Sequence, residues 1–235
     1  MDLKADIHCH ILHCVDDGAS GMEEALELLH IEAEQGVGQI YLTPHLRHRM
    51  FESPDDEIIR RFKQLKERAA DIPLGLHLSR EYHFDKMLAR AIMDDRLMLM
   101  EGNTLLTEFS YTDEFEFVTD AVMRLKKRGI QVLIAHAERC RALWKDTSKA
   151  AYLCDMGALL QANAASILGE DGRSERKCAL QLLKEDLIYA VASDAHNTVD
   201  RLPNLDRAEQ FITKKFGGQM AEKLLHTNPM KLIAD

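Results

Sequence analysis

The chain has 235 residues, 46% of them hydrophobic and 29% charged, which is the composition of a globular protein with material for one large core. Its formal charge of −9 argues against nucleic acid or an anionic membrane surface as a partner. The sequence contains no run of about 18 apolar residues, the length that a membrane-spanning helix needs. Because no signal-peptide pattern is present and the five cysteines are scattered, we expect one cytoplasmic domain covering residues 1–235.

The chain begins with a strand-like run followed by a helical segment. The run "ADIHCH" at residues 5–10 predicts a strand. Residues 20–35 predict a helix that starts with Ser20 and Glu23, a pair with capping-box spacing, and ends at Gly36. Two histidines therefore lie in the first predicted strand.

A second strand and helix follow in the same order. The run "GQIYLTPH" at residues 38–45 predicts the strand, and residues 54–71 predict the helix. Ser53 is expected to cap this helix, with Pro54 at its first position. This alternation is typical of parallel strands joined by crossover helices.

The rest of the chain repeats the pattern. Residues 113–128 predict a further helix, stopped by Gly129. Seven strand-like runs without a glycine-rich phosphate loop favour an α/β barrel over an open dinucleotide-binding sheet. The remaining five runs are residues 75–81, 104–110, 131–138, 158–166 and 187–196.

Residue types that bind metals stand at the ends of these runs. Because the carboxyl ends of parallel strands converge on one face of a barrel, these side chains are expected to meet. They are His8, His10, His45, Glu81, Glu108, His136, Asp194 and His196. One such histidine would be interpreted as structural, but burying eight titratable groups together without cations would be very costly. The set predicts two or three divalent ions, with manganese expected first and iron, zinc, magnesium or cobalt as alternatives.

Two further carboxylates follow the first strand. Asp16 and Asp17 both precede Gly18, and an Asp-Gly pair by itself is typical of a turn. The residue types alone leave open which of the two aspartates binds metal.

The order of these motifs carries a family resemblance. "DIHCH", "TPH", "TEFS", "IAHAER" and "SDAHN", with Glu81 at a strand end, resemble the polymerase-and-histidinol-phosphatase (PHP) superfamily of metal-dependent phosphoesterases. "VDDG", "HLRHRMFESP" and "SDAHNTVDR" are similar to one branch, the bacterial tyrosine-protein phosphatases that accompany capsule and exopolysaccharide kinases. The resemblance runs from residue 6 to about residue 230. It implies a distorted seven-stranded (β/α)7 barrel of the PHP type that holds three metal ions.

The resemblance also assigns the ligands to ions. It implies that Glu81 bridges two ions and that Asp17 is a ligand, which leaves Asp16 in a turn or supporting role. The implied sets are His8, His10, Glu81 and Asp194 for the first ion, Glu81, Glu108 and His136 for the second, and Asp17, His45 and His196 for the third.

Arginines near the ligands complete the predicted chemistry. Arg139 and Arg201 follow His136 and His196 closely, so both are expected on loops at the barrel mouth. The resemblance assigns both to phosphate binding, for which guanidinium groups are suited, and Arg47 is a further candidate. Arg80 replaces a small residue of the family pattern and would change the charge of the site if it pointed inward.

These observations together predict a metal-dependent protein-tyrosine phosphatase. No cysteine is followed six positions later by an arginine, so the cysteine-based mechanism is excluded. The substrate implied by the resemblance is a tyrosine-phosphorylated protein, the C-terminal tail of a bacterial tyrosine kinase that controls polysaccharide export. The alternatives are a small-molecule phosphatase acting on a substrate such as histidinol phosphate, and a PHP-type interaction module without activity.

Overall fold

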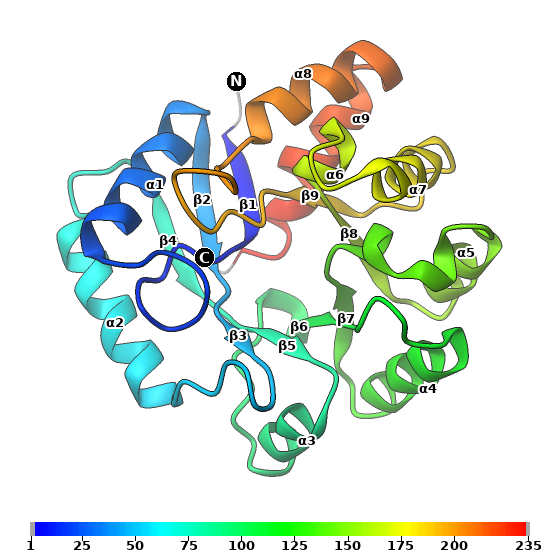
Figure 1. Ribbon diagram of the computed structural model, residues 1–235, viewed down its shortest axis with the longest axis horizontal. Coiled ribbons are helices and arrows are strands. Elements are labelled where there is room, and N and C mark those ends of the chain that lie inside the picture. The colour runs from blue at the N-terminus through cyan, green and yellow to red at the C-terminus, as the bar shows by residue number, and fades with distance from the viewer. Residues whose placement is uncertain (1–2, 234–235) are drawn as a thin grey trace.

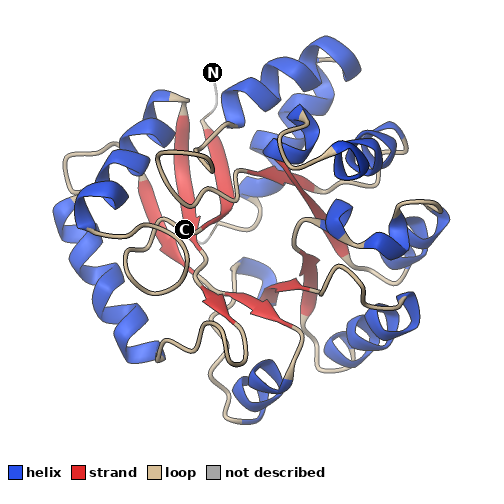
Figure 2. Ribbon diagram, viewed as in Figure 1, coloured by secondary structure: helices blue, strands red, loops and turns tan. Residues whose placement is uncertain are grey.

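Short parallel strands surround the centre of the molecule and helices cover their outer side, as the alternating sequence pattern predicts (Figure 1). The computed structural model describes residues 3–233. Figure 2 shows the strands as an inner layer and the helices as an outer one. The strands are β1 (Lys4–Cys9), β2 (Val37–Leu42), β3 (His45–Leu46), β4 (Gly75–Leu78), β5 (Glu81–His83), β6 (Thr104–Glu108), β7 (Gln131–Ile134), β8 (Leu159–Asn163) and β9 (Ala190–Ala192).

The helices follow the strands along most of the chain. Among residues 3–233, no helix combines the length and the apolar character needed to cross a bilayer. They are α1 (Met22–Glu34), α2 (Asp55–Arg68), α3 (Lys86–Met93), α4 (Phe115–Lys126), α5 (Ser148–Asp155), α6 (Ala164–Leu168), α7 (Arg173–Lys184), α8 (Leu205–Phe216), α9 (Gly218–Glu222) and α10 (Asn228–Met230), with short helical turns at Glu101–Asn103, Ala137–Arg139, Arg141–Leu143 and Lys223–Thr227.

Two predicted helix starts differ in detail from the structure. The first helix begins at Met22, so the Ser20 hydroxyl donates to Glu24 (2.6 Å) and the expected pair with Glu23 is replaced. The second begins at Asp55, and the Ser53 hydroxyl donates to the Val15 carbonyl (2.6 Å) instead of capping the helix. In both cases a nearby acceptor outcompetes the predicted cap.

All strand pairs are parallel, and they form two ladders. One ladder has the order β1-β2-β4, and the other has the order β3-β5-β6-β7-β8-β9. The chain leaves the first ladder between β2 and β3, returns to it between β3 and β4, and leaves it again between β4 and β5. Backbone bonds from Ser79 N to Leu42 O (3.0 Å) and from Glu81 N to Pro44 O (3.3 Å) hold these two interrupted strands side by side.

The last strand meets the first one without forming a ladder. Beyond the end of β9, Asp194 N donates to His8 O (2.9 Å) and His10 N donates to Ala195 O (2.8 Å). The structure therefore confirms the predicted α/β architecture with a curled parallel sheet, whereas the closed seven-stranded barrel is not confirmed. The difference arises because two strands are interrupted and β9 ends before it reaches this seam.

The centre of the curled sheet is filled by apolar side chains. Ile7, Tyr41, Leu106, Leu133 and Ala190, from strands distant in the sequence, belong to one buried cluster. Larger clusters lie where the helices pack on the strands. The carboxyl ends of the strands are left to carry polar side chains, which is the arrangement that the sequence predicts.

Candidate metal centre

The nine predicted ligands lie close together at the carboxyl ends of the strands. Most of them come from within or directly after β1, β3, β5, β6 and β7 or from the segment after β9, and Asp17 comes from the loop after β1. Their nitrogen and oxygen atoms form four overlapping groups, in each of which the atoms lie within 4.8 Å of one another. The groups are His10, Asp17, His45 and His196; His8, Glu81 and His136; His8, His10 and Asp194; and His45, Glu81 and Glu108.

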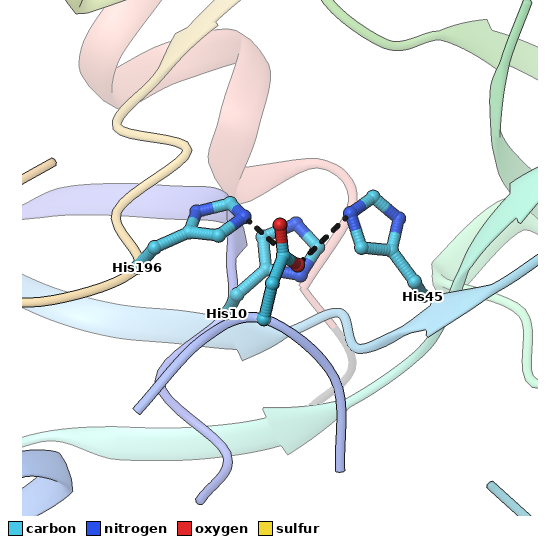
Figure 3. A group of neighbouring side chains, drawn as sticks. His10, His45 and His196 are labelled. Atoms are coloured by element: carbon cyan, nitrogen blue, oxygen red, sulfur yellow. Dashed lines mark ion pairs between the residues drawn. The ribbon is translucent and has the colours of Figure 1, made fainter. Parts of the chain in front are cut away.

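The group nearest the solvent contains three imidazoles and one carboxylate. Figure 3 shows the three imidazoles, His10, His45 and His196, with ion pairs of the group dashed. Asp17 Oδ1 lies 3.6 Å from His45 Nε2 and 3.5 Å from His196 Nε2. The Asp17 side chain is 46% exposed, whereas the two imidazoles are largely buried, so this group opens toward the cavity.

Glu81 lies at the centre of the buried groups. Its Oε2 is 3.3 Å from Nε2 of both His8 and His10 and 2.8 Å from His45 Nδ1. Its Oε1 is 2.9 Å from His136 Nε2. One carboxylate thus contacts four imidazoles, which is the position expected of a residue shared between binding groups.

The histidines are oriented by residues behind them. Asp16 Oδ2 lies 2.7 Å from His10 Nδ1 and also accepts from the His45 backbone N–H (2.9 Å). This places Asp16 behind His10 and outside the four groups. A carboxylate at Nδ1 leaves the Nε2 lone pair of His10 directed at the cluster.

Sequence reasoning missed two residues with the same role. Gln161 Oε1 lies 3.0 Å from His8 Nδ1 and accepts a hydrogen bond from His136 N (2.8 Å). Asn163 accepts a hydrogen bond from Gln161 Nε2 (2.8 Å) and donates one to Asp194 Oδ2 (2.7 Å). Both amides belong to β8, the only predicted strand for which no ligand was proposed. The sequence pattern that could have predicted them is a pair of polar residues at alternate positions of an otherwise apolar, buried strand.

The charges of the cluster depend strongly on one another. Burial lowers the pKa of His8, but attraction to Glu81 and Asp194 outweighs burial and raises this pKa to about 9. In the same way, burial lowers the pKa of His45, but attraction to Glu81 and Glu108 raises it to about 10. Burial and the neighbouring His10 lower the pKa of His196 to about 4. Burial opposes ionisation of Asp194, yet His8, Arg139, His196 and Arg201 hold the pKa of this carboxyl well below its usual range.

The three predicted arginines face the same cavity as the ligands. Arg139 Nη1 and Arg201 Nη2 each lie 3.0 Å from Asp194 Oδ2, and Arg47 Nη1 lies 3.5 Å from Glu108 Oε1. Arg139 also reaches Asp171, which sequence reasoning did not predict (3.2 Å). The cavity has a volume of about 340 Å³ and is lined by these arginines and five of the predicted ligands.

Arg80 does not point into this cavity. Its side chain is fully buried behind β3, where Nη2 donates to His45 O (2.7 Å) and Nη1 donates to Ser53 O (3.1 Å) and Asp55 (2.8 Å). We expect Arg80 to change the charge of the site only if its side chain points inward. It does not, because His45 O and Asp55 hold the guanidinium on the side of β3 away from the cavity.

Comparisons with known proteins agree with this architecture. A family model described as capsular polysaccharide synthesis, CpsB/CapC, matches residues 4–234. The tyrosine-protein phosphatase CpsB of Streptococcus pneumoniae is 33% identical over 238 residues, covering 98% of each chain. The tyrosine-protein phosphatase YwqE of Bacillus subtilis is 29% identical over 218 residues, covering 92% of this chain and 86% of that one.

Solved structures give the same result. A crystal structure determined for YwqE from Bacillus subtilis and CpsB from Streptococcus pneumoniae, metal-dependent tyrosine phosphatases, matches with a TM-score of 0.89 at 28% identity. It covers 97% of this chain and 94% of that chain. The phosphotriesterase homology protein from Escherichia coli matches with a TM-score of 0.66 at 12% identity, which shows a shared fold.

Proposed function

The chain belongs to the CpsB/CapC capsular polysaccharide synthesis family, and from this premise we propose that its nine-residue cluster is the catalytic centre of a metal-dependent protein-tyrosine phosphatase. The observation that carries the proposal is the convergence itself. Ligand atoms from separate strand ends lie within 4.8 Å of one another and border a cavity that also holds three arginines.

The residues of the cluster fit divalent cations. Buried polar atoms in proteins are rarely left without a hydrogen-bond partner. Four of the nine ligands nevertheless have a buried atom without a partner in hydrogen-bonding geometry, although two of these atoms, His45 Nδ1 and Glu81 Oε2, lie 2.8 Å apart: His45 Nδ1, Glu81 Oε2, Glu108 Oε1 and His196 Nε2. In addition, Nε2 of His8 and Nε2 of His10 lie only 3.2 Å apart. Imidazole nitrogens and carboxylate oxygens in this arrangement suit manganese, iron, zinc or cobalt, and magnesium less well because it prefers oxygen ligands.

We assign three ions to the cluster, with manganese as the first candidate. Glu81 is the shared ligand in this assignment, supported by its contacts with four imidazoles. The sets are the ones that the family resemblance implies: His8, His10, Glu81 and Asp194; Glu81, Glu108 and His136; and Asp17, His45 and His196. The third set lies within a single group of the structure, and the second joins two groups through Glu81.

The chemistry follows from the two halves of the site. Divalent cations, when bound, neutralise phosphoryl oxygens and lower the pKa of water. Arg139, Arg201 and Arg47 supply further positive charge for the phosphate from the cavity side. In the reaction, a bond forms between a water oxygen and phosphorus while the bond from phosphorus to the tyrosine oxygen breaks. Tyrosine has a pKa of about 10, so its phenolate leaves without a dedicated general acid.

The substrate and setting complete the proposal. We assign the C-terminal tail of a bacterial tyrosine kinase as the substrate protein, because the family takes part in capsule synthesis. A cytoplasmic location is supported by the five cysteines, all of which are free thiols. Counting β2 with β3 and β4 with β5 as single interrupted strands gives the seven strand positions of a distorted PHP-type barrel.

Steady-state kinetics on three substrates tests the proposed function. A phosphotyrosine peptide, the same peptide with phosphoserine, and histidinol phosphate are compared with manganese present. We expect the phosphotyrosine peptide to have the highest kcat/KM. A preference for histidinol phosphate would favour a small-molecule phosphatase, and no turnover of any of the three would favour an interaction module without activity.

A further inference from the structure

The cavity beside the cluster is lined by two kinds of residue. The first kind consists of proposed metal ligands and arginines. The second consists of Met50, Phe51, Phe109, Ser110 and Tyr111, which come from the loop after β3 and the loop after β6. A phosphate group bound by the ligands and arginines would therefore share its cavity with largely apolar and aromatic side chains.

Three of these five side chains are engaged in contacts within the protein. Phe51 stacks on the ring of His45, with centroids 4.9 Å apart and an interplanar angle of 11°. Phe109 is buried and packs against Phe84 (5.7 Å between centroids). The Ser110 hydroxyl lies 3.0 Å from His83 Nε2. Each of these residues supports a neighbouring element.

Met50 and Tyr111 are more exposed than the other three residues, at 59% and 46%, although Tyr111 also interacts electrostatically with Arg139. A methionine thioether and a tyrosine ring are side chains that pack well against an aromatic ring. They stand on two separate loops, and both line the same cavity.

Both loops are held in place by backbone bonds. The loop after β3 is a small hairpin in which Arg47 N donates to Phe51 O (2.8 Å) and Phe51 N donates to Arg47 O (2.9 Å). On the other loop, Arg141 N donates to Tyr111 O (3.2 Å) and Ser110 N donates to the Asp113 side chain (2.8 Å). The two exposed side chains are thus presented by ordered backbone, which reduces the entropy cost of binding.

We propose that Met50 and Tyr111 form an aryl clamp that receives the tyrosine ring of the substrate. This inference rests on the proposed function, because it concerns the leaving group of that reaction. The clamp contacts the ring and not the phosphate, so its loss should weaken use of phosphotyrosine without weakening the binding of phosphate alone.

The experiment compares free phosphotyrosine as a substrate with inorganic phosphate as a competitive inhibitor. The variants are Met50→Ala, Tyr111→Ala, the double variant and Tyr111→Phe, which keeps the ring. Met93→Ala and Tyr152→Ala are matched controls, because these side chains are 80% and 53% exposed and do not line the cavity. The metal content of every variant is measured alongside.

We expect each alanine variant to lower kcat/KM for phosphotyrosine by about two- to ten-fold, and the double variant to lower it further. Tyr111→Phe should restore most of the loss, and the inhibition constant of inorganic phosphate should change by less than about two-fold. The clamp is overturned if the wild type hydrolyses phosphotyrosine and the double variant does so equally well. It is also overturned if phosphate inhibition weakens in parallel with substrate use. Absence of any phosphotyrosine hydrolysis by the wild type would instead overturn the proposed function, and the clamp with it.

Discussion

Asp194 is the residue at which the ligands and the arginines meet. Its Oδ1 lies 3.5 Å from Nε2 of both His8 and His10, and its Oδ2 lies 3.0 Å from Arg139 and from Arg201. The backbone of Asp194 has a φ of +53°, in the left-handed region that a non-glycine residue rarely adopts. One carboxylate therefore positions the two phosphate-binding candidates directly beside the histidine pair.

The first prediction concerns the charge that Arg201 offers to phosphate. Arg201→Ala should lower kcat/KM for phosphotyrosine by roughly ten- to a thousand-fold, the range for one lost charge-stabilising donor. Because Arg201 is 36% exposed, the melting temperature and metal content should remain close to wild type. The matched control is Arg207→Ala, since Arg207 pairs with Glu170 outside this cavity (2.7 Å). Wild-type kinetics in Arg201→Ala would refute the assignment.

The second prediction concerns Glu81 as the shared ligand. Glu81→Gln keeps the shape of the side chain but replaces one oxygen of the carboxylate, whose two oxygens together face four imidazoles. Elemental analysis should show that the variant loses more than one ion per chain relative to wild type. Glu57→Gln, which removes a carboxylate from the surface of α2, should keep the full complement. Loss of a single ion or of none would show that Glu81 is not shared.

At the scale of elements, the hairpin after β3 depends on a buried arginine. Arg80 donates to His45 O and Ser53 O at the two ends of the hairpin and pairs with Asp55 at the start of α2. These two carbonyls would otherwise accept hydrogen bonds from water, and the Arg80 guanidinium donates to them instead. Arg80 thus joins a metal ligand, the hairpin and a helix from behind the site.

The third prediction tests this connection by removing the guanidinium. Arg80→Met should lower the free energy of unfolding by about 3 kcal/mol, because it leaves buried acceptors unpaired and breaks a largely buried ion pair. Urea denaturation measures this change. The control is Arg96→Met, since Arg96 pairs with the other oxygen of Asp55 (2.7 Å) from an exposed position and should matter much less. Equal losses in the two variants would contradict a special role for Arg80.

The elements also show what could be predicted from the sequence. Eight of the nine candidate ligands could be predicted because burying so many imidazoles and carboxylates together at the ends of parallel strands is too costly without cations, whereas Asp17 is chosen over Asp16 on the family resemblance alone. Gln161 and Asn163 were missed because a neutral amide costs far less to bury and can hydrogen-bond to many partners within a strand. The direction of Arg80 could not be predicted either, since it depends on acceptors contributed by His45, Ser53 and Asp55. The strand interruptions that divide the sheet into two ladders depend likewise on long-range pairing.

At the scale of the whole molecule, the cluster spans the seam between the two ladders. His8 and His10 belong to the β1 side, whereas Asp194 and His196 follow β9 on the other side. Only two backbone bonds, Asp194 N to His8 O and His10 N to Ala195 O, join the described backbone at this point. Side chains from both sides meet in two of the four groups of ligand atoms. An ion held by both sides would therefore close the sheet where it has no ladder.

The last prediction follows from this position. Removing metal with a chelator should abolish phosphotyrosine hydrolysis and speed hydrogen exchange at the seam amides of His10 and Asp194. If the free ion was present at about 100 times its Kd, its removal costs about 2.7 kcal/mol of stabilisation. Where the seam must open and release the ligands before an amide can exchange, this loss corresponds to roughly 100-fold faster exchange. Amides at the far end of the β2–β4 ladder, near Gln39 and Gly75, should change much less because they lie away from every ligand. Restoring manganese should reverse both effects. Seam amides that exchange at the same rate after complete metal loss would show that the cations take part in catalysis without closing the sheet.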